Sequence, residues 1–362
     1  MARHPAPAPA AARGSAPSAP STGQTPTARS SRRSGLSFST KTKPPPFPVI
    51  ATCPSPTCAC APTPSMPPGF EIDHKTNING LISHYAQHVL VCTGKPDWPS
   101  RIEDDNSGDN LAADLRELVG RGGAFSDPFH NISVLNSSFP PSPLPRADVQ
   151  SASVYLLPEF RYVPFLPRVS FESVEALVKG FLLPEELHPM HGGLSPVHRD
   201  RLVRKTAYRA LLPGVRDVRD ILVLVCGHGG RDQRCGVYGP LLQGEFERCL
   251  PGKGVEVLKG PVEVEEEGGA AALEGEARRS ARVGLISHVG GHKFAGNVIV
   301  YIPPGLKTEA GEEHPLAGHG IWYGRVEPRH VEGIVTETIL KGNVISDMFR
   351  GGIRRDGHIL RL

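Results

Sequence analysis

The stretch DILVLVCGHGGRDQRCG, residues 220–236, decides how this chain is read. Residues 221–225 form an apolar run rich in β-branched side chains, which predicts a buried strand. The strand leads into Cys226, and Cys235 follows with the spacing C-x8-C. Glycines around the two cysteines allow positive φ angles and close backbone approach. The stretch therefore predicts a rigid strand that carries two thiols into one glycine-rich loop.

A second glycine-rich motif, SHVGGHK at residues 287–293, supplies two imidazoles. Its histidines, His288 and His292, have the spacing H-x-G-G-H. Two thiolates and two imidazoles brought together by two loops make a four-ligand metal site. We therefore predict Cys226, Cys235, His288 and His292 as ligands of one metal centre. The residue types alone are compatible with zinc as well as with iron and sulfide, and zinc is the commoner occupant of such a set.

Composition excludes several classes of protein. The 362 residues carry a net charge of +3, and no basic stripe alternates with aromatic residues, so nucleic acid is not an expected partner. No apolar run of about 18 residues occurs, so no membrane span is expected. The seven cysteines are an odd number in a chain of this size, which argues for a reducing compartment rather than a disulfide framework.

Residues 1–65 predict a disordered leader. They contain no Asp or Glu and are rich in Arg, Ser, Ala and Pro. This composition is typical of a mitochondrial transit peptide, which would direct the protein to the matrix. A plain disordered tail is the alternative, because such a segment cannot bury a core. Its three cysteines, Cys53, Cys58 and Cys60, are interpreted as incidental.

Two α/β domains are expected after the leader, over residues 66–212 and 213–350, with a tail at 351–362. The second domain contains an acidic, glycine-rich insertion at 261–280. Both domains begin with an apolar strand that runs into a cysteine, so the two are possible relatives. Apolar patterning, caps and turn residues predict strands at 87–94, 131–136, 153–157, 220–225, 254–258, 297–302 and 320–326, and helices at 110–119, 171–183, 239–250 and 329–340.

The second domain resembles the thioredoxin-like [2Fe-2S] ferredoxins. The resemblance rests on LVLVC at 222–226, CG at 235–236 followed by GP at 239–240, NVIVY at 297–301 and IWYGRV at 321–326. Those ferredoxins use four cysteines, the last two spaced C-x3-C just before the central strand. Here histidines occupy that spacing, a pattern that resembles the sucrase/ferredoxin-like family over roughly residues 66–350. The resemblance implies a [2Fe-2S] cluster with both cysteines on one iron and both histidines on the other.

An electron-transfer protein of mitochondrial redox homeostasis is the function that this resemblance implies. Neutral imidazoles should make their iron the reducible one and raise the reduction potential relative to four thiolates. Titration of the imidazoles should couple electron transfer to protons. We expect a redox carrier rather than a catalyst with its own substrate. The sequence names neither the redox partner proteins nor the oligomeric state.

Two other functions fit the same residues. A structural zinc protein would use all four ligands. A thioredoxin-like thiol oxidoreductase is less well supported, because no C-x-x-C motif occurs. A Rieske protein is not supported, because its two motifs would each mix a cysteine with a histidine. The flanking cations Arg231, Arg234 and Lys293 have two interpretations: docking of an acidic partner or stabilisation of the reduced cluster, or ordinary solvated charge.

Overall fold

The computed structural model describes residues 44–106, 108–143, 149–264 and 279–362, which belong to one compact unit. Residues 1–43 of the predicted leader (1–65) lie outside the described residues, as does the part of the acidic insertion at 265–278. No helix among the described residues is long and apolar enough to cross a membrane.

The first half of the compact unit is built on four adjacent strands. Strand β2 (Gln87–Cys92) pairs in parallel with β3 (Ile132–Ser137) and antiparallel with β4 (Ser151–Leu157). Strand β5 (Arg161–Pro167) pairs antiparallel with β4. Helix α1 (Leu111–Val119) connects β2 to β3 and begins where the Asn110 side chain accepts the Ala113 N–H. The strand order is therefore β3-β2-β4-β5.

The second half repeats this arrangement. Strand β7 (Ile221–Cys226) pairs in parallel with β9 (Ser280–Ile286) and antiparallel with β10 (Val298–Ile302). Strand β11 (His319–Tyr323) pairs antiparallel with β10. Helix α4 (Gln233–Gly252) follows β7 as α1 follows β2. The order β9-β7-β10-β11 matches that of the first half, and β3 meets β9 to join the two into one mixed sheet.

The remaining elements extend this frame. Helix α2 follows β5 and helix α5 follows β11, the fourth strand of each half. Each of the two helices continues as a π-helix. In chain order the remaining elements are β1 (Val49–Ile50), η1 (Ile102–Asp104), α2 (Phe171–Leu177), η2 (Val178–Leu182), η3 (Pro189–Gly193), α3 (Pro196–Leu202), η4 (Thr206–Leu211), β6 (Arg216–Asp217), β8 (Glu256–Val257), η5 (His292–Phe294), α5 (Pro328–Gly333), η6 (Ile334–Leu340), β12 (Val344–Ile345), β13 (Phe349–Arg354) and β14 (Ile359–Leu360).

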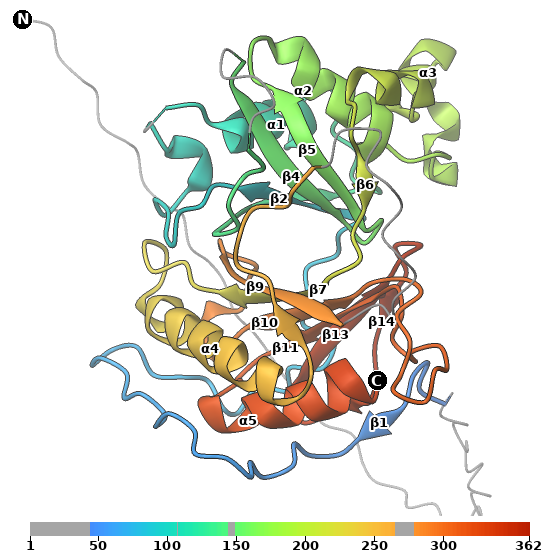
Figure 1. Cartoon of the computed structure of the whole chain (residues 1–362). Coiled ribbons are helices and arrows are strands. Elements are labelled where there is room, and N and C mark those ends of the chain that lie inside the picture. The colour runs from blue at the N-terminus through green and yellow to red at the C-terminus, as the bar shows by residue number, and fades with distance from the viewer. Residues whose placement is uncertain (1–43, 107, 144–148, 265–278) are drawn as a thin grey trace, which may run out of the picture. The chain divides into compact units, whose positions relative to one another are not determined.

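Four layers result, with helices outside and the two halves of the sheet inside (Figure 1). Alternate residues of a strand face opposite sides, and both sides of β7 are buried. Val223 and Val225 pack beneath α4, whereas Leu222 and Leu224 pack against the first half. Helices α1 and α2 cover the outer side of the first half in the same way. The centre of the sheet is therefore a rigid platform for the loops that follow its strands.

The predicted α/β class is confirmed as a mixed α/β fold with a large mixed sheet. Most predicted elements are present, but the predicted helix at 239–250 begins earlier, at Gln233. The Asp232 side chain accepts the Arg234 N–H and caps the helix, so Cys235 lies in the first helical turn rather than in a loop. The prediction missed β5, whose sequence RYVPFLP carries two prolines, and β9.

Both ends of the described region are more ordered than predicted. Within the predicted leader, Phe47 is buried and β1 pairs with β12. Further along, the backbone N–H of Thr57 donates to the Glu332 carboxylate at 2.6 Å. The predicted tail contributes to β13 and contains β14, which pair with each other. Among the described residues, packed structure therefore begins at Phe47 and continues past residue 350, because apolar residues at both ends complete the second half's core.

Candidate metal centre

The two cysteines of the predicted site come from a strand end and a helix start. Cys226 is the last residue of β7, is 2% exposed, and donates its N–H to the Asn297 carbonyl at 2.9 Å. Cys235 is also buried, in the first turn of α4. The positive end of a helix stabilises thiolates. The two side chains are thus held at the end of the sheet on elements that cannot easily move.

The thiols of Cys226 and Cys235 affect each other's protonation. Interactions with Cys235 and with His288 hold the pKa of the Cys226 thiol well below its usual range. Interaction with Cys226 and burial raise the pKa of Cys235. The pair therefore favours a thiolate on Cys226 and a thiol on Cys235. On binding a metal centre, Cys235 would release its proton to solvent, because metals bind cysteine as the thiolate.

The two histidines lie in the segment that follows β9. The end of β9 lies beside the end of β7 that carries Cys226. The ring centroids of His288 and His292 lie 5.1 Å apart at an interplanar angle of 38°. The Nδ1 atom of each ring is buried and has no hydrogen-bond partner among the described residues. An unpartnered buried nitrogen is costly, and two in adjacent rings call for an explanation. A group bound to both Nδ1 atoms would supply one.

Glycines bring both loops into close contact with their surroundings. Gly290 and Gly291 have φ angles of 83° and 74°, in the left-handed region that favours glycine. A Cβ on Gly291 would lie 2.6 Å from Nη2 of Arg350. In the cysteine loop, a Cβ on Gly230 would lie 2.1 Å from the Trp98 carbonyl oxygen. At these positions a larger residue would displace the ligand loops from their present positions.

His228 fixes the backbone of the histidine loop. Its Nδ1 accepts the His288 N–H at 3.0 Å. Its Nε2 must then carry the proton, and it donates to the carbonyls of Pro99 at 2.9 Å and Trp98 at 3.1 Å. Both ring nitrogens are occupied by backbone groups. His228 therefore positions His288 and is not available as a ligand.

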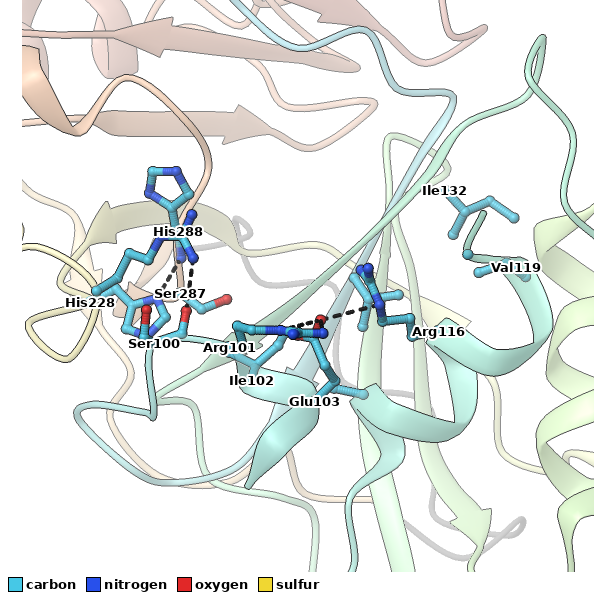
Figure 2. Close-up of a pocket in the computed structure, with 14 residues that line it drawn as sticks. Ser100, Arg101, Ile102, Glu103, Arg116, Val119, Ile132, His228, Ser287 and His288 are labelled. Atoms are coloured by element: carbon cyan, nitrogen blue, oxygen red, sulfur yellow. Dashed lines mark hydrogen bonds and ion pairs between the residues drawn. The ribbon is translucent and has the colours of Figure 1, made fainter. Parts of the chain in front are cut away.

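A cavity of about 580 Å³ opens beside His288. Figure 2 shows His288, His228 and Ser287 at one side of it and the apolar residues Val119 and Ile132 at the other. Between them, Glu103 forms ion pairs with Arg101 at 3.3 Å and Arg116 at 3.1 Å. The cavity reaches the edge of the site, but its charged groups are largely paired with one another.

The flanking cations are also mostly paired. Arg234 forms a salt bridge with Asp232 at 2.8 Å, and Lys293 forms one with Asp73 at 2.9 Å. Arg231 donates to the Ser100 carbonyl at 3.2 Å. The neighbourhood of His292, whose side chain is 40% exposed, is therefore close to electrically balanced.

Other residues with metal-binding chemistry lie elsewhere and have other partners. Nε2 of His191 is 2.8 Å from the Asp127 carboxylate, and the His188 ring stacks on Phe129. Burial raises the pKa of Cys92 to about 12 and that of Cys249 to about 11, as expected for packed thiols.

In the part of the chain that the structure describes, no three Cys, His, Asp or Glu side chains surround a common point as they would around a bound ion. The four predicted ligands are neighbours without that arrangement. Their fit to a metal centre rests on the donor set, the burial of both cysteines and the two unpartnered Nδ1 atoms. Sequence reasoning gave no site role to Asn297 or Arg350, which hold the histidine loop by hydrogen bonds; the sequence marks Asn297 only as the first residue of the NVIVY motif.

The sequence of this chain is similar to those of several known proteins. Residues 78–351 match the family described as sucrase/ferredoxin-like. The chain is similar to altered inheritance of mitochondria protein 32 of Meyerozyma guilliermondii, with 30% identity over 298 residues, 80% of this chain and 88% of that protein. The protein of the same name from Debaryomyces hansenii is 29% identical over 294 residues, 78% of this chain and 88% of the relative. No solved structure matches the chain significantly.

Proposed function

Because this chain belongs to the sucrase/ferredoxin-like family, we propose that it is an electron-transfer protein holding a [2Fe-2S] cluster on Cys226, Cys235, His288 and His292. The observation that carries the proposal is the pair of buried, unpartnered Nδ1 atoms beside two buried cysteines. Thiolates and imidazoles are both established ligands of such clusters. The name of the family includes the words ferredoxin-like, which is consistent with this cofactor.

The thioredoxin-like character of residues 213–350 is part of the proposal. Strands in the order β9-β7-β10-β11, with one helix after β7 and another after β11, are the arrangement expected for such a domain. The identical order in the first half supports its assignment, over residues 66–212, as a divergent relative. Among the described residues, only the second half has cysteine and histidine loops at the ends of its parallel strands.

Each ligand side chain has a distinct task in this proposal. A [2Fe-2S] cluster accepts and releases a single electron. Cys226 and Cys235 anchor the buried side and exclude water from it. His288 is held in place through its backbone by His228, and the partly exposed ring of His292 is the point nearest to an approaching redox partner. Redox partner proteins are accordingly proposed to dock around His292.

A structural zinc site is the second candidate, because the same Cys2His2 set suits zinc. Zinc would hold the two loops together but would not carry electrons. The glycine-rich loops and the family favour the cluster. Zinc and iron occupy the same four side chains, so metal content distinguishes the two functions.

Location and cofactor can be tested on one preparation. The relatives' names refer to mitochondria, and the acid-free leader favours the matrix. Cells that express the full chain are fractionated, and the protein is purified anaerobically from the mitochondrial matrix. We expect equal amounts of iron and acid-labile sulfide, two of each per chain, with a brown colour. Absence from the matrix fraction would contradict the location, and stoichiometric zinc without sulfide would contradict the cofactor.

A further inference from the structure

Arg350 is a buried cation that ties three segments together behind the histidine loop. It lies in β13 and is 3% exposed. Its Nε and Nη2 donate to the Leu81 carbonyl at 3.1 and 2.6 Å. Its Nη1 donates to Asn297 Oδ1 at 2.7 Å and to the Gly290 carbonyl at 3.2 Å. Asn297 in turn donates to the Gly291 carbonyl at 3.0 Å.

No carboxylate among the described residues forms an ion pair with Arg350. All its hydrogen-bond acceptors are neutral, and its guanidinium lies 5.6 Å from the ring centroid of Phe294 and 5.7 Å from that of Trp322. Burial lowers its pKa to about 10, so it is still charged at neutral pH. A buried charge without a counter-ion is unfavourable, so a charged arginine at this buried position is unusual.

Arg350 lies next to the predicted ligands. Its Nη1 binds the carbonyl of Gly290, which lies between the two ligand histidines. Negative charge on Cys226 or Cys235 favours the protonated form of Arg350. The cation is thus placed where it would oppose negative charge at the metal centre. Its hydrogen bonds fix that position, because the guanidinium fork has partners on both sides.

We propose that Arg350 is the counter-cation of the centre and raises its reduction potential; the inference rests on the function proposed above. Two thiolates and two neutral imidazoles leave an oxidised [2Fe-2S] site without net charge, and one added electron makes the site negative. A fixed, buried cation stabilises only the negative form appreciably. Arg350 is therefore a positioning and tuning residue rather than a ligand.

The test compares three variants of the full, cluster-containing protein. Arg350→Gln removes the charge, Arg350→Lys keeps it without the fork, and Arg354→Gln removes an exposed cation on the same strand, where it pairs with Asp356. Reduction potentials are measured by titration followed by visible absorbance, with iron content on each sample. We expect Arg350→Gln to lower the reduction equilibrium constant about tenfold, equivalent to 59 mV for one electron. Arg350→Lys should recover most of this shift, and Arg354→Gln should leave the potential unchanged.

Each result decides the inference. A wild-type potential in cluster-loaded Arg350→Gln would overturn it and leave Arg350 a purely structural role. If Arg350→Gln fails to hold the cluster, Arg350→Lys decides: a potential near that of the wild type supports the charge effect, and a large fall contradicts it. If the wild-type protein holds no cluster at all, the function itself fails, independently of Arg350.

Discussion

Replacing Cys235 by alanine should remove nearly all of the iron from the purified protein. Cys235 lies in the first turn of α4 and lowers the pKa of the Cys226 thiol, so its loss removes one ligand and the partner that acidifies another. Loss of even a supporting partner of a metal ligand typically costs about 10–100-fold in affinity, and loss of a ligand costs more. We expect iron and acid-labile sulfide to fall by more than about tenfold.

The same helix offers the matched control. Cys249 is also a buried thiol of α4, but it lies near the other end of the helix and packs in the apolar core. Cys249→Ala should keep the full iron content and lose only some stability, because it leaves a small cavity. Equal iron loss in the two variants would show that the helix, rather than the Cys235 ligand, is what the cluster needs. Full iron content in Cys235→Ala would remove Cys235 from the ligand set.

Acidification should destabilise the protein through His88, which lies far along the chain from the metal-site motifs. His88 is 1% exposed, its ring stacks on Tyr85 with centroids 3.6 Å apart, and its Nδ1 lies 3.0 Å from the Tyr301 hydroxyl. Burial lowers its pKa to about 3. In the unfolded chain a histidine titrates near pH 6.5. Below about pH 6.5 the unfolded chain therefore binds a proton that the folded protein rejects, and stability falls until about pH 3.

The measurable quantity is the slope of the free energy of unfolding against pH. One such group contributes up to about 1.4 kcal/mol per pH unit to the free energy of unfolding. Urea unfolding of wild type, His88→Gln and His198→Gln is compared at several values from about pH 7 to about pH 4. His88→Gln should be less stable at neutral pH but have a shallower pH dependence. His198, exposed in α3, should leave the slope unchanged. An unaltered slope in His88→Gln would mean that His88 becomes protonated in the folded state.

Local sequence signals predicted much of the fold. The apolar run ending at Cys226 is β7, and the segment predicted as a helix at 110–119 is α1, with Asn110 as its cap. These elements depend on neighbours in sequence, and short-range patterns report them well. Strand β5 was not predicted, because prolines such as Pro164 and Pro167 usually disfavour strands. In the fold, β5 is held by pairing with β4 and with the short β6.

The surroundings of the site were less predictable than its motifs. The spacing of the cysteines and histidines predicted residues that the fold does bring together. Arg350 and the contact between His228 and Pro99 depend on segments distant in the chain, and no spacing rule connects them. The start of α4 was not predicted. It depends on the cap that Asp232 provides, and the glycines that precede Asp232 indicated a loop instead. Motifs identified the candidate ligands, and tertiary packing supplied the groups that hold and tune them.

Electron paramagnetic resonance of the dithionite-reduced protein, labelled with ¹⁵N-histidine, is the most direct test of the central claim. A reduced [2Fe-2S] site held by Cys226, Cys235, His288 and His292 should give a rhombic spin-half signal with an average g below that of all-thiolate ferredoxins. Hyperfine spectra should resolve two histidine nitrogens, because reduction places the electron mainly on the histidine-bound iron. A signal without histidine nitrogen coupling, or a colourless protein with zinc and no signal, would contradict the account.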